Sequence, residues 1–319
     1  MKSSGDHKTI YLMGIGGIAM GTLAAMLKEC GYEVMGSDQN LYPPMSTHLE
    51  RLGIPLYEGY RPENLWARPV DLVIVGNVIR RENPEAQVVL EHGIPYMSMP
   101  EAIAHFFLRN HHSIVVAGTH GKSTTSSLAA WLLAQAGLDP SAFIGAFVND
   151  WGTGFRLGKG PFMVLEGDEY DTAFFDKGPK FLHYKPWLGV ITSVEFDHAD
   201  IFPNLDKIVD AFRSFVRLIP ADGYLIANGD DPICRMLAQE CNGRVMIYGR
   251  SEHAQWRILE YDCREGHGAC VYYDPVHRER RRLECSLMGR HNLGNALAAL
   301  LVSSLAGVDH HRAQEALLS

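Results

Sequence analysis

The sequence predicts an α/β protein of two domains, and three observations lead to this prediction. Apolar strand patterns alternate with helical patterns along most of the chain, which is typical of a parallel sheet with crossover helices. Two of the strands run into glycine loops that open helices. The 319 residues also exceed the usual size of a single core, so a second domain is the natural expectation.

The first part of the chain has the pattern of a Rossmann-like domain. Strands are predicted at 9–16, 32–38 and 70–77, a helix at 18–31, and a strand, turn and helix within 94–110. The polar stretch RNHHS then precedes a fresh apolar strand. We therefore predict a first domain over 1–110 and a second over 111–319.

The second part continues the alternation and then changes character. It has strands near 114–117, 162–166, 188–194 and 223–227, helices at 123–136 and 205–218, short β segments from 244 to 287, and a last helix at 292–306. This pattern predicts an α/β domain with a small β region.

Composition excludes several classes of protein. Hydrophobic residues make up 46% and charged residues 21% of the chain, as in ordinary globular proteins, and no apolar run approaches the roughly 18 residues of a membrane helix. The start, MKSSGDHK, is no signal peptide, and the six cysteines lack C-x-x-C spacing. The net charge of −8 argues against a nucleic-acid binder. We expect a cytoplasmic protein that binds neither nucleic acid nor membrane.

The stretch VVAGTHGKSTT resembles a phosphate-binding loop with one departure. The usual pattern is G-x-x-x-x-G-K-[ST], but Val116 stands where the first glycine is expected, and the nearest upstream glycine is Gly118. A strand precedes the loop and a helix follows it, which is the context that such a loop requires. Lys122 could contact the β- and γ-phosphates, and the Ser123 hydroxyl could ligate Mg²⁺. A structural glycine turn with an exposed lysine is the alternative.

Acidic side chains follow two of the predicted strands. PFMVLEGDEYD ends in Glu166, Asp168, Glu169 and Asp171, and clustered carboxylates repel each other unless a cation such as Mg²⁺ neutralises them. A solvated acidic loop is the alternative. LGVITSVEFDHAD places His198 at a strand end, where it could ligate a metal or contact the γ-phosphate.

The first glycine loop, GIGGIAMG, leaves two interpretations open. Gly14, Gly16 and Ala19 satisfy G-x-G-x-x-[GA], and Asp38 lies where an acid that binds a ribose is expected. Alone, this pattern predicts an NAD-dependent oxidoreductase. The same geometry serves any nucleotide with a diphosphate, including a UDP-sugar.

Together, GTHGKSTT, EGDEYD, EFDHAD and GRHNLGNALAAL resemble the Mur ligase family of peptidoglycan synthesis and recycling. In that family the shorter loop, with its glycine at position 118, is the normal form. Two stretches, SDQNLYPPMSTHLERLGI and DEYDTAFFDKGPKFLHYKP, resemble the branch that adds the tripeptide L-alanyl-γ-D-glutamyl-meso-diaminopimelate to UDP-N-acetylmuramate. The L-alanine-adding branch, which usually reads D-E-S-D in place of Asp168 to Asp171, is the alternative.

The resemblance implies an N-terminal UDP-binding domain and a P-loop-type ATP-binding domain, with ATP and Mg²⁺ as cofactors. The residues implied to bind the UDP-sugar are Gly14, Ile15, Gly16 and Gly17 at the diphosphate, Ser37 and Asp38 near the uridine, and Asn77 near the sugar. Those implied to bind ATP are Gly118, Thr119, His120, Gly121, Lys122, Ser123 and Thr124 at the phosphates, and His291, Asn292 and Asn295 at the adenine. The implied metal ligands are Ser123, Glu166 and His198, and the implied catalytic residues are Lys122, Glu166 and His198.

Some features depart from the family or leave alternatives. Asn292 could instead cap the last helix. Gly167 and Ala199 replace an alanine and a methionine that the family usually has, and no lysine stands where several members carry a modified one. The chain ends at RAQEALLS, so we expect the family's C-terminal domain to be absent and the chain alone to bind nucleotides without forming product. A distant NAD-dependent oxidoreductase and a non-catalytic nucleotide-binding fragment remain alternatives, and the pattern does not indicate an oligomeric state.

Overall fold

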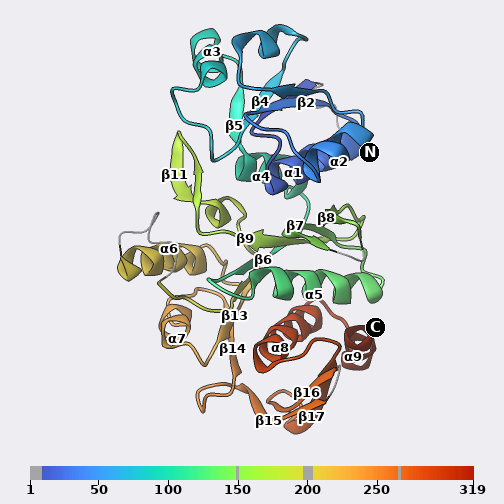
Figure 1. Cartoon of the computed structure of the whole chain (residues 1–319). Coiled ribbons are helices and arrows are strands. Elements are labelled where there is room, and N and C mark those ends of the chain that lie inside the picture. The colour runs from blue at the N-terminus through green and yellow to red at the C-terminus, as the bar shows by residue number, and fades with distance from the viewer. Residues whose placement is uncertain (1–8, 149–150, 197–203, 265–266) are drawn as a thin grey trace. The chain divides into compact units, whose positions relative to one another are not determined.

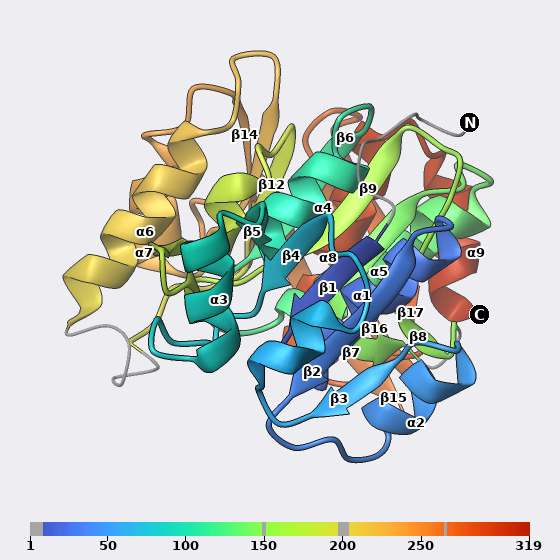
Figure 2. The same ribbon diagram turned by 90° about the horizontal axis from the view of Figure 1, so that it is seen from above.

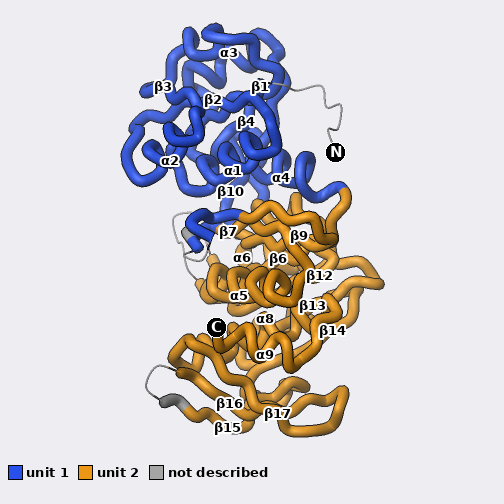
Figure 3. The backbone as a smooth tube through the Cα atoms, turned by 90° about the vertical axis from the view of Figure 1, so that its right-hand side faces the viewer, with its two compact units in different colours: residues 1–109, 145–155, 170–179 blue, residues 110–144, 156–169, 180–319 orange. Residues whose placement is uncertain are grey.

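The computed structural model describes residues 9–148, 151–196, 204–264 and 267–319 (Figure 1). The chain divides into two compact units, drawn in two colours in Figure 3. The first unit comprises residues 1–109, 145–155 and 170–179, and the second comprises 110–144, 156–169 and 180–319. Two short segments of the later chain thus belong to the first unit.

The first unit is built on a five-stranded parallel sheet in the order β3-β2-β1-β4-β5 (Figure 2). Its strands are β1 (Thr9–Met13), β2 (Glu33–Asp38), β3 (Leu56–Glu58), β4 (Leu72–Val75) and β5 (Tyr96–Ser98). Its helices are α1 (Ile18–Glu29), α2 (Met45–Arg51), η1 (Pro62–Trp66), α3 (Pro84–His92) and α4 (Met99–Phe107), and the hairpin β10 (Asp171–Ala173) and β11 (Asp176–Pro179) joins them. The strand order reverses between β1 and β4, and ligands of such sheets bind at this switch point.

The second unit contains most of a ten-stranded sheet in the order β17-β16-β15-β14-β13-β12-β6-β9-β7-β8. The strands of this sheet are β6 (His112–Ala117), β7 (Ser141–Val148), β8 (Thr153–Arg156), β9 (Phe162–Gly167), β12 (Leu188–Ile191), β13 (Tyr224–Asn228), β14 (Arg244–Gly249), β15 (Trp256–Arg264), β16 (His267–Asp274) and β17 (Glu279–Cys285). The helices of the second unit are α5 (Lys122–Gln135), η2 (Lys180–His183), α6 (Leu205–Arg217), α7 (Pro232–Ala238), α8 (Arg290–Leu305) and α9 (His310–Leu318).

Pairing within this sheet separates a parallel part from an antiparallel one. Strands β7, β9, β6, β12, β13, β14 and β15 pair in parallel, whereas β15, β16 and β17 pair antiparallel. The central strands are buried on both faces, which explains why they read as continuous apolar runs. Because their carboxyl ends meet at one edge, the loops that follow them can build a common site.

The structure corrects two details of the predicted elements. No turn separates β5 from α4, because the Ser98 hydroxyl accepts from the Glu101 N–H while the Glu101 carboxylate accepts from the Ser98 N–H, so the helix begins at once. Strand β12 ends at Ile191 rather than 194, because the backbone beyond it bonds to the second glycine loop. In the described part of the chain, no helix is both long and apolar enough to cross a membrane.

Candidate nucleotide-binding sites

The second glycine loop is short because the expected first glycine position lies inside the sheet. Val116 is part of β6, where it pairs with Val190 of β12 and with Glu166 of β9. Strand β6 ends at Ala117 and α5 begins at Lys122, so only four residues make the turn. Position 116 is therefore a buried strand position, and the turn itself begins at Gly118.

Both glycines of this loop lie against other segments. Gly118 has a φ of +141°, and a Cβ there would stand 2.1 Å from the Thr192 Oγ1 atom. Gly121 has a φ of +84°, and its Cβ would stand 2.7 Å from the Asn295 Oδ1 atom. The loop can therefore approach α8 and the segment directly after β12 this closely only with glycine at both positions.

Hydrogen bonds fasten the loop to the segment that follows β12. The Thr119 N–H donates to the Ser193 carbonyl at 2.9 Å, and the His120 N–H donates to the Ser193 hydroxyl at 3.0 Å. The Glu195 N–H donates to the Thr119 hydroxyl at 2.9 Å. Helix α5 has no side-chain cap and no acid in its first turn. The backbone N–H groups of Lys122, Ser123 and Thr124 are therefore available to an anion.

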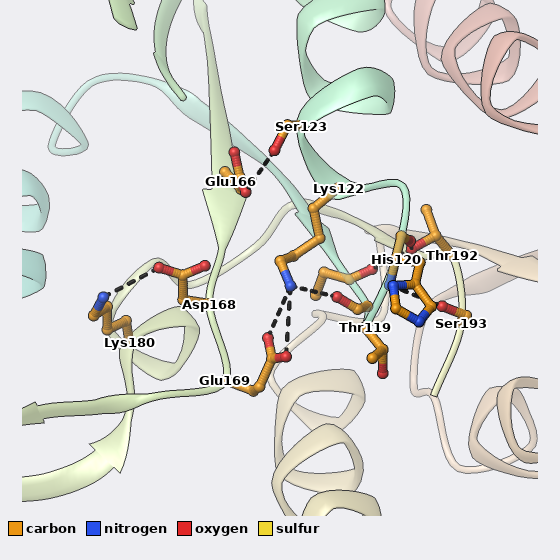
Figure 4. Close-up of polar contacts among 12 residues, drawn as sticks. Thr119, His120, Lys122, Ser123, Glu166, Asp168, Glu169, Lys180, Thr192 and Ser193 are labelled. Atoms are coloured by element: carbon orange, nitrogen blue, oxygen red, sulfur yellow. Dashed lines mark hydrogen bonds and ion pairs between the residues drawn. The ribbon is translucent and has the colours of Figure 1, made fainter. Parts of the chain in front are cut away.

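Lys122, the first residue of α5, is held by two acceptors (Figure 4). Its Nζ atom donates to the Gly118 carbonyl at 2.6 Å and to the Glu169 Oε2 atom at 3.1 Å. The ammonium group thus lies within the glycine loop.

Ser123 and Glu166 are brought together, as the resemblance implied. The Ser123 hydroxyl donates to the Glu166 Oε1 atom at 2.9 Å, between the start of α5 and the end of β9 (Figure 4). A hydroxyl and a carboxylate are the hard oxygen ligands that Mg²⁺ prefers. The third expected ligand, His198, lies outside the described residues. Among the residues that are described, no three His, Cys, Asp or Glu side chains gather around a common point.

The sequence predicted that a cation such as Mg²⁺ neutralises the acidic cluster at the end of β9. In the structure, lysine side chains pair with most of these carboxylates. Asp168 pairs with Lys180 at 3.1 Å, and Asp171 pairs with Lys177 at 3.5 Å. Glu169 pairs with Lys122. Since three of the four carboxylates have a lysine of this chain as partner, charge repulsion within the cluster does not by itself require a metal.

A cavity of about 870 Å³ lies beside the loop, at the carboxyl ends of the parallel strands. Of the predicted residues, His120, Gly121, His291 and Asn295 line it. Asn292 is not among the lining residues; its Nδ2 atom donates to the Met288 carbonyl at 2.8 Å and its Oδ1 atom accepts from Asn295 at 3.5 Å. The alternative that Asn292 caps α8 is wrong, because the N-cap is Gly289 and no side chain caps the helix.

Several residues of this cavity were missed in the sequence. They come from the ends of β13 and β14, the segments directly after these strands, β15 and α8, and they are Asn228, Asp230, Asp231, Tyr248, Arg250, Tyr261 and Arg290. The guanidinium groups of Arg250 and Arg290 each lie 5.4 Å from the Tyr261 ring centroid. Burial, and next the thiol of Cys234, raise the pKa of the Tyr248 phenol. Polar residues directly after a predicted strand at 223–227 were the signal that could have found the first of these.

The backbone N–H groups of the first glycine loop are hydrogen-bonded within the protein. The N–H groups of Gly14 and Ile15 both donate to the Ser37 carbonyl, and the Gly17 N–H donates to the Gly14 carbonyl. The Gly16 N–H donates to the Asp38 carboxylate at 2.8 Å. The backbone donors left without an intrahelical partner are those of the first turn of α1, which begins at Ile18 and has no side-chain cap.

Ser37 and Asn77, both predicted to lie near the UDP-sugar, differ in their exposure to solvent. Ser37 is fully buried, and its hydroxyl donates to the Glu85 carboxylate at 2.6 Å. Glu85 also accepts from the Tyr11 hydroxyl at 2.9 Å and the Asn64 amide at 2.7 Å, and burial raises the pKa of its carboxyl group. Asn77, by contrast, is exposed directly after β4, at the switch point.

Comparison with known families matches both units. The model of the Mur ligase family, catalytic domain, matches residues 9–111, and that of the Mur ligase middle domain matches residues 116–303. The second match alone spans more than half of the chain. The chain belongs to the Mur ligase family.

The relatives include two kinds of Mur ligase. The chain is 41% identical over 300 residues to UDP-N-acetylmuramate–L-alanyl-gamma-D-glutamyl-meso-2,6-diaminoheptandioate ligase of Escherichia coli (strain K12), covering 94% of this chain and 64% of that protein. It is 35% identical to UDP-N-acetylmuramate–L-alanine ligase of Anaeromyxobacter sp. (strain Fw109-5), covering 97% of this chain and 65% of that protein. The chain therefore spans slightly less than two thirds of these relatives.

A solved structure shares the whole fold. The structure of UDP-N-acetylmuramate:L-alanyl-gamma-D-glutamyl-meso-diaminopimelate ligase from Neisseria meningitides is 40% identical, with a TM-score of 0.90 and coverage of 97% of both chains. The expected α/β fold with Mur ligase N-terminal and middle domains is thus confirmed.

Proposed function

We propose that this chain carries the ATP-binding and UDP-sugar-binding parts of a ligase of peptidoglycan recycling. The reaction joins the tripeptide L-alanyl-γ-D-glutamyl-meso-diaminopimelate to UDP-N-acetylmuramate. The observation that carries the proposal is the meeting of Lys122, Ser123 and Glu166 at the start of α5, because a Mg·ATP site needs a cation and oxygen ligands beside a helix N-terminus. The substrates are those in the names of the Escherichia coli and Neisseria relatives.

The second unit fits ATP and Mg²⁺ through its own donor set. The Ser123 hydroxyl and the Glu166 carboxylate would hold Mg²⁺, which neutralises charge on phosphate oxygens when it is bound. The first turn of α5 and Lys122 would hold the phosphates. His291 and Asn295 line the neighbouring cavity, which is large enough for the nucleoside. A metal-binding role for His198 remains a prediction.

The proposed chemistry is ATP-dependent amide formation. A carboxylate oxygen of the muramyl group attacks the γ-phosphorus, the bond to ADP breaks, and an acyl phosphate forms. The amino group of the tripeptide then attacks the acyl carbon, loses a proton, and phosphate leaves. A carboxylate that approaches a triphosphate brings like charges together, so Lys122 would lower the barrier by neutralising the developing charge.

The first unit supplies the proposed UDP-sugar site. Its donors would be the N–H groups at the start of α1, because the amides of the glycine loop are bonded within the protein. Asn77, exposed after β4, would contact the sugar end. Ser37 would act through the backbone, since its hydroxyl is bonded to Glu85.

The experiment that tests this proposal is a substrate panel on an enzyme spanning the full length of the relatives. We expect UDP-N-acetylmuramate, Mg·ATP and the tripeptide to give product and phosphate in equal amounts. A preference for L-alanine over the tripeptide would instead support the second candidate, the L-alanine ligase, which the Anaeromyxobacter relative favours. Binding of NADH without binding of the UDP-sugar would overturn both.

A further inference from the structure

We propose that Glu169 limits the affinity of the phosphate loop for nucleoside polyphosphates by acting as a built-in counter-ion to Lys122. This inference rests on the proposed ATP site and assigns a role to a residue outside the predicted donor set. The sequence placed Glu169 among carboxylates that could hold a metal. The structure pairs it with the lysine of the loop instead.

The pair is close and shielded from solvent. The Lys122 Nζ atom lies 3.1 Å from Glu169 Oε2 and 3.5 Å from Glu169 Oε1, so both carboxylate oxygens face the ammonium group. The side chain of Glu169 is 3% exposed and that of Lys122 is 11% exposed. Solvent screening is therefore weak, and each charge acts strongly on its surroundings.

The geometry lets a phosphate reach Lys122 without first displacing Glu169. An ammonium group has three N–H donors, and one of them is bonded to the Gly118 carbonyl and another to Glu169. The contact to the second Glu169 oxygen, Oε1, is the longest of the three at 3.5 Å, so a phosphate oxygen can take over this N–H while the Oε2 bond is kept. Two anions bonded to the same nitrogen stand about 5 Å apart, given hydrogen bonds of about 3 Å, so the Glu169 carboxylate repels the incoming phosphate.

Glu169 thus has two opposite effects on the site. It anchors Lys122 together with Gly118, which favours binding of an anion. Its negative charge also cancels that of Lys122, which opposes binding. Glutamine separates the two effects, because its amide oxygen still accepts a hydrogen bond from Lys122 but carries no charge.

The test is calorimetric titration of the 319-residue chain and its variants with Mg·ADP and with a non-hydrolysable Mg·ATP analogue. We expect Glu169→Gln to bind both nucleotides about tenfold more tightly, because a poorly screened like charge close to the phosphates is removed. A purely structural role for Glu169 predicts weaker binding or none of this gain. The matched control is Asp171→Asn, whose carboxylate pairs with Lys177 and is about half exposed, and it should bind as the unaltered chain does.

The variant Lys122→Ala tests the proposed ATP site independently of the role of Glu169. If Lys122→Ala weakens binding while Glu169→Gln leaves it unchanged or also weakens it, the ATP site stands and the role of Glu169 is overturned. If the unaltered chain and Glu169→Gln both fail to bind nucleotide, both proposals are overturned. Should Glu169→Gln not fold, Glu169→Met removes the same charge at similar volume, and tighter binding is again the supporting result.

Discussion

The two glycine loops of this chain have the same local design but different charges around it. Each follows a buried strand and opens a helix that has no side-chain cap and no acid in its first turn. In the first unit, the charged side chain bonded to the loop is Asp38, which accepts from Gly16. In the second unit, the loop carries Lys122, with Ser123 beside Glu166.

The difference indicates which ligand each loop can serve. A helix N-terminus alone is enough to bind a diphosphate that takes no part in the reaction. Transfer of a phosphoryl group also needs a cation and a metal to stabilise developing charge. We therefore assign the reactive nucleotide to the second loop and the carrier nucleotide to the first.

The largest expected effect comes from removing the lysine of the second loop. In an enzyme spanning the full length of the relatives, Lys122→Ala should abolish measurable turnover, since loss of a preorganised charge costs about 3 to 4 kcal/mol at the transition state. UDP-sugar binding to the first unit should not change. Phosphate release measures turnover, and calorimetry measures UDP-sugar binding. Near-normal turnover would contradict the assignment of the reactive nucleotide to the second loop.

A substitution in the first loop should have the reverse pattern. A Cβ at Gly16 would stand 3.0 Å from the Asp38 Oδ2 atom, so Gly16→Val should displace this carboxylate and distort the loop. We expect UDP-N-acetylmuramate to bind about tenfold or more weakly, by steric exclusion, and Mg·ATP to bind as before. Titration with each ligand measures this. Loss of ATP binding alone would mean that the two sites have been exchanged.

A smaller effect is expected on the Mg²⁺ dependence of ligand binding, which should differ between the two loops. Ser123→Ala removes the hydroxyl that contacts Glu166, so the Mg²⁺ concentration for half-maximal ATP binding should rise about tenfold. UDP-sugar binding should be independent of Mg²⁺ in both proteins. Titration at graded Mg²⁺ tests this prediction, and an unchanged Mg²⁺ requirement would exclude Ser123 as a ligand.

The smallest expected effect concerns the buried Glu85 under the first loop. Burial raises the pKa of its carboxyl above the usual 4.5, so the folded state holds this proton more tightly than the unfolded state. Its contribution to stability is therefore present below pH 4.5 and is lost as pH rises through the raised pKa. Glu85→Gln should remove this component of the pH dependence, because glutamine does not titrate. Thermal unfolding across this pH range, with the unaltered chain as control, checks it. The same pH dependence in both proteins would contradict this assignment.

Much of the fold could be predicted because its strands are continuous apolar runs and its long helices are periodic. Strands β1, β2, β4, β5, β6, β9, β12 and β13, and helices α1, α5, α6 and α8, lie where the patterns placed them, whereas strands β3, β7 and β8 were not predicted. The short elements α2, α3 and α7 were missed, since seven to nine residues carry little periodicity. For α3, the Asn83-Pro84 start was a readable cap signal.

The positions of site residues could be predicted where a sequence motif determines the local backbone conformation. They could not be predicted where contacts between distant parts of the chain determine them. Lys122, Ser123 and Glu166 could be placed because a strand, loop and helix fix their positions. The partner of Glu169 could not, because pairing with Lys122 depends on contact between residues 47 positions apart. Likewise, nothing local shows that Ser37 faces the buried Glu85 or that Arg250 and Arg290 share Tyr261.

One measurement tests the central claim most directly, namely that the two loops serve different nucleotides. The 319-residue chain is first saturated with UDP-N-acetylmuramate and then titrated with a non-hydrolysable ATP analogue, with and without Mg²⁺. We predict one equivalent of the analogue bound in the presence of Mg²⁺, weak binding without it, and no displacement of the UDP-sugar. Competition between the two ligands for a single site, or binding of the UDP-sugar that depends on Mg²⁺ and Lys122, would contradict the account.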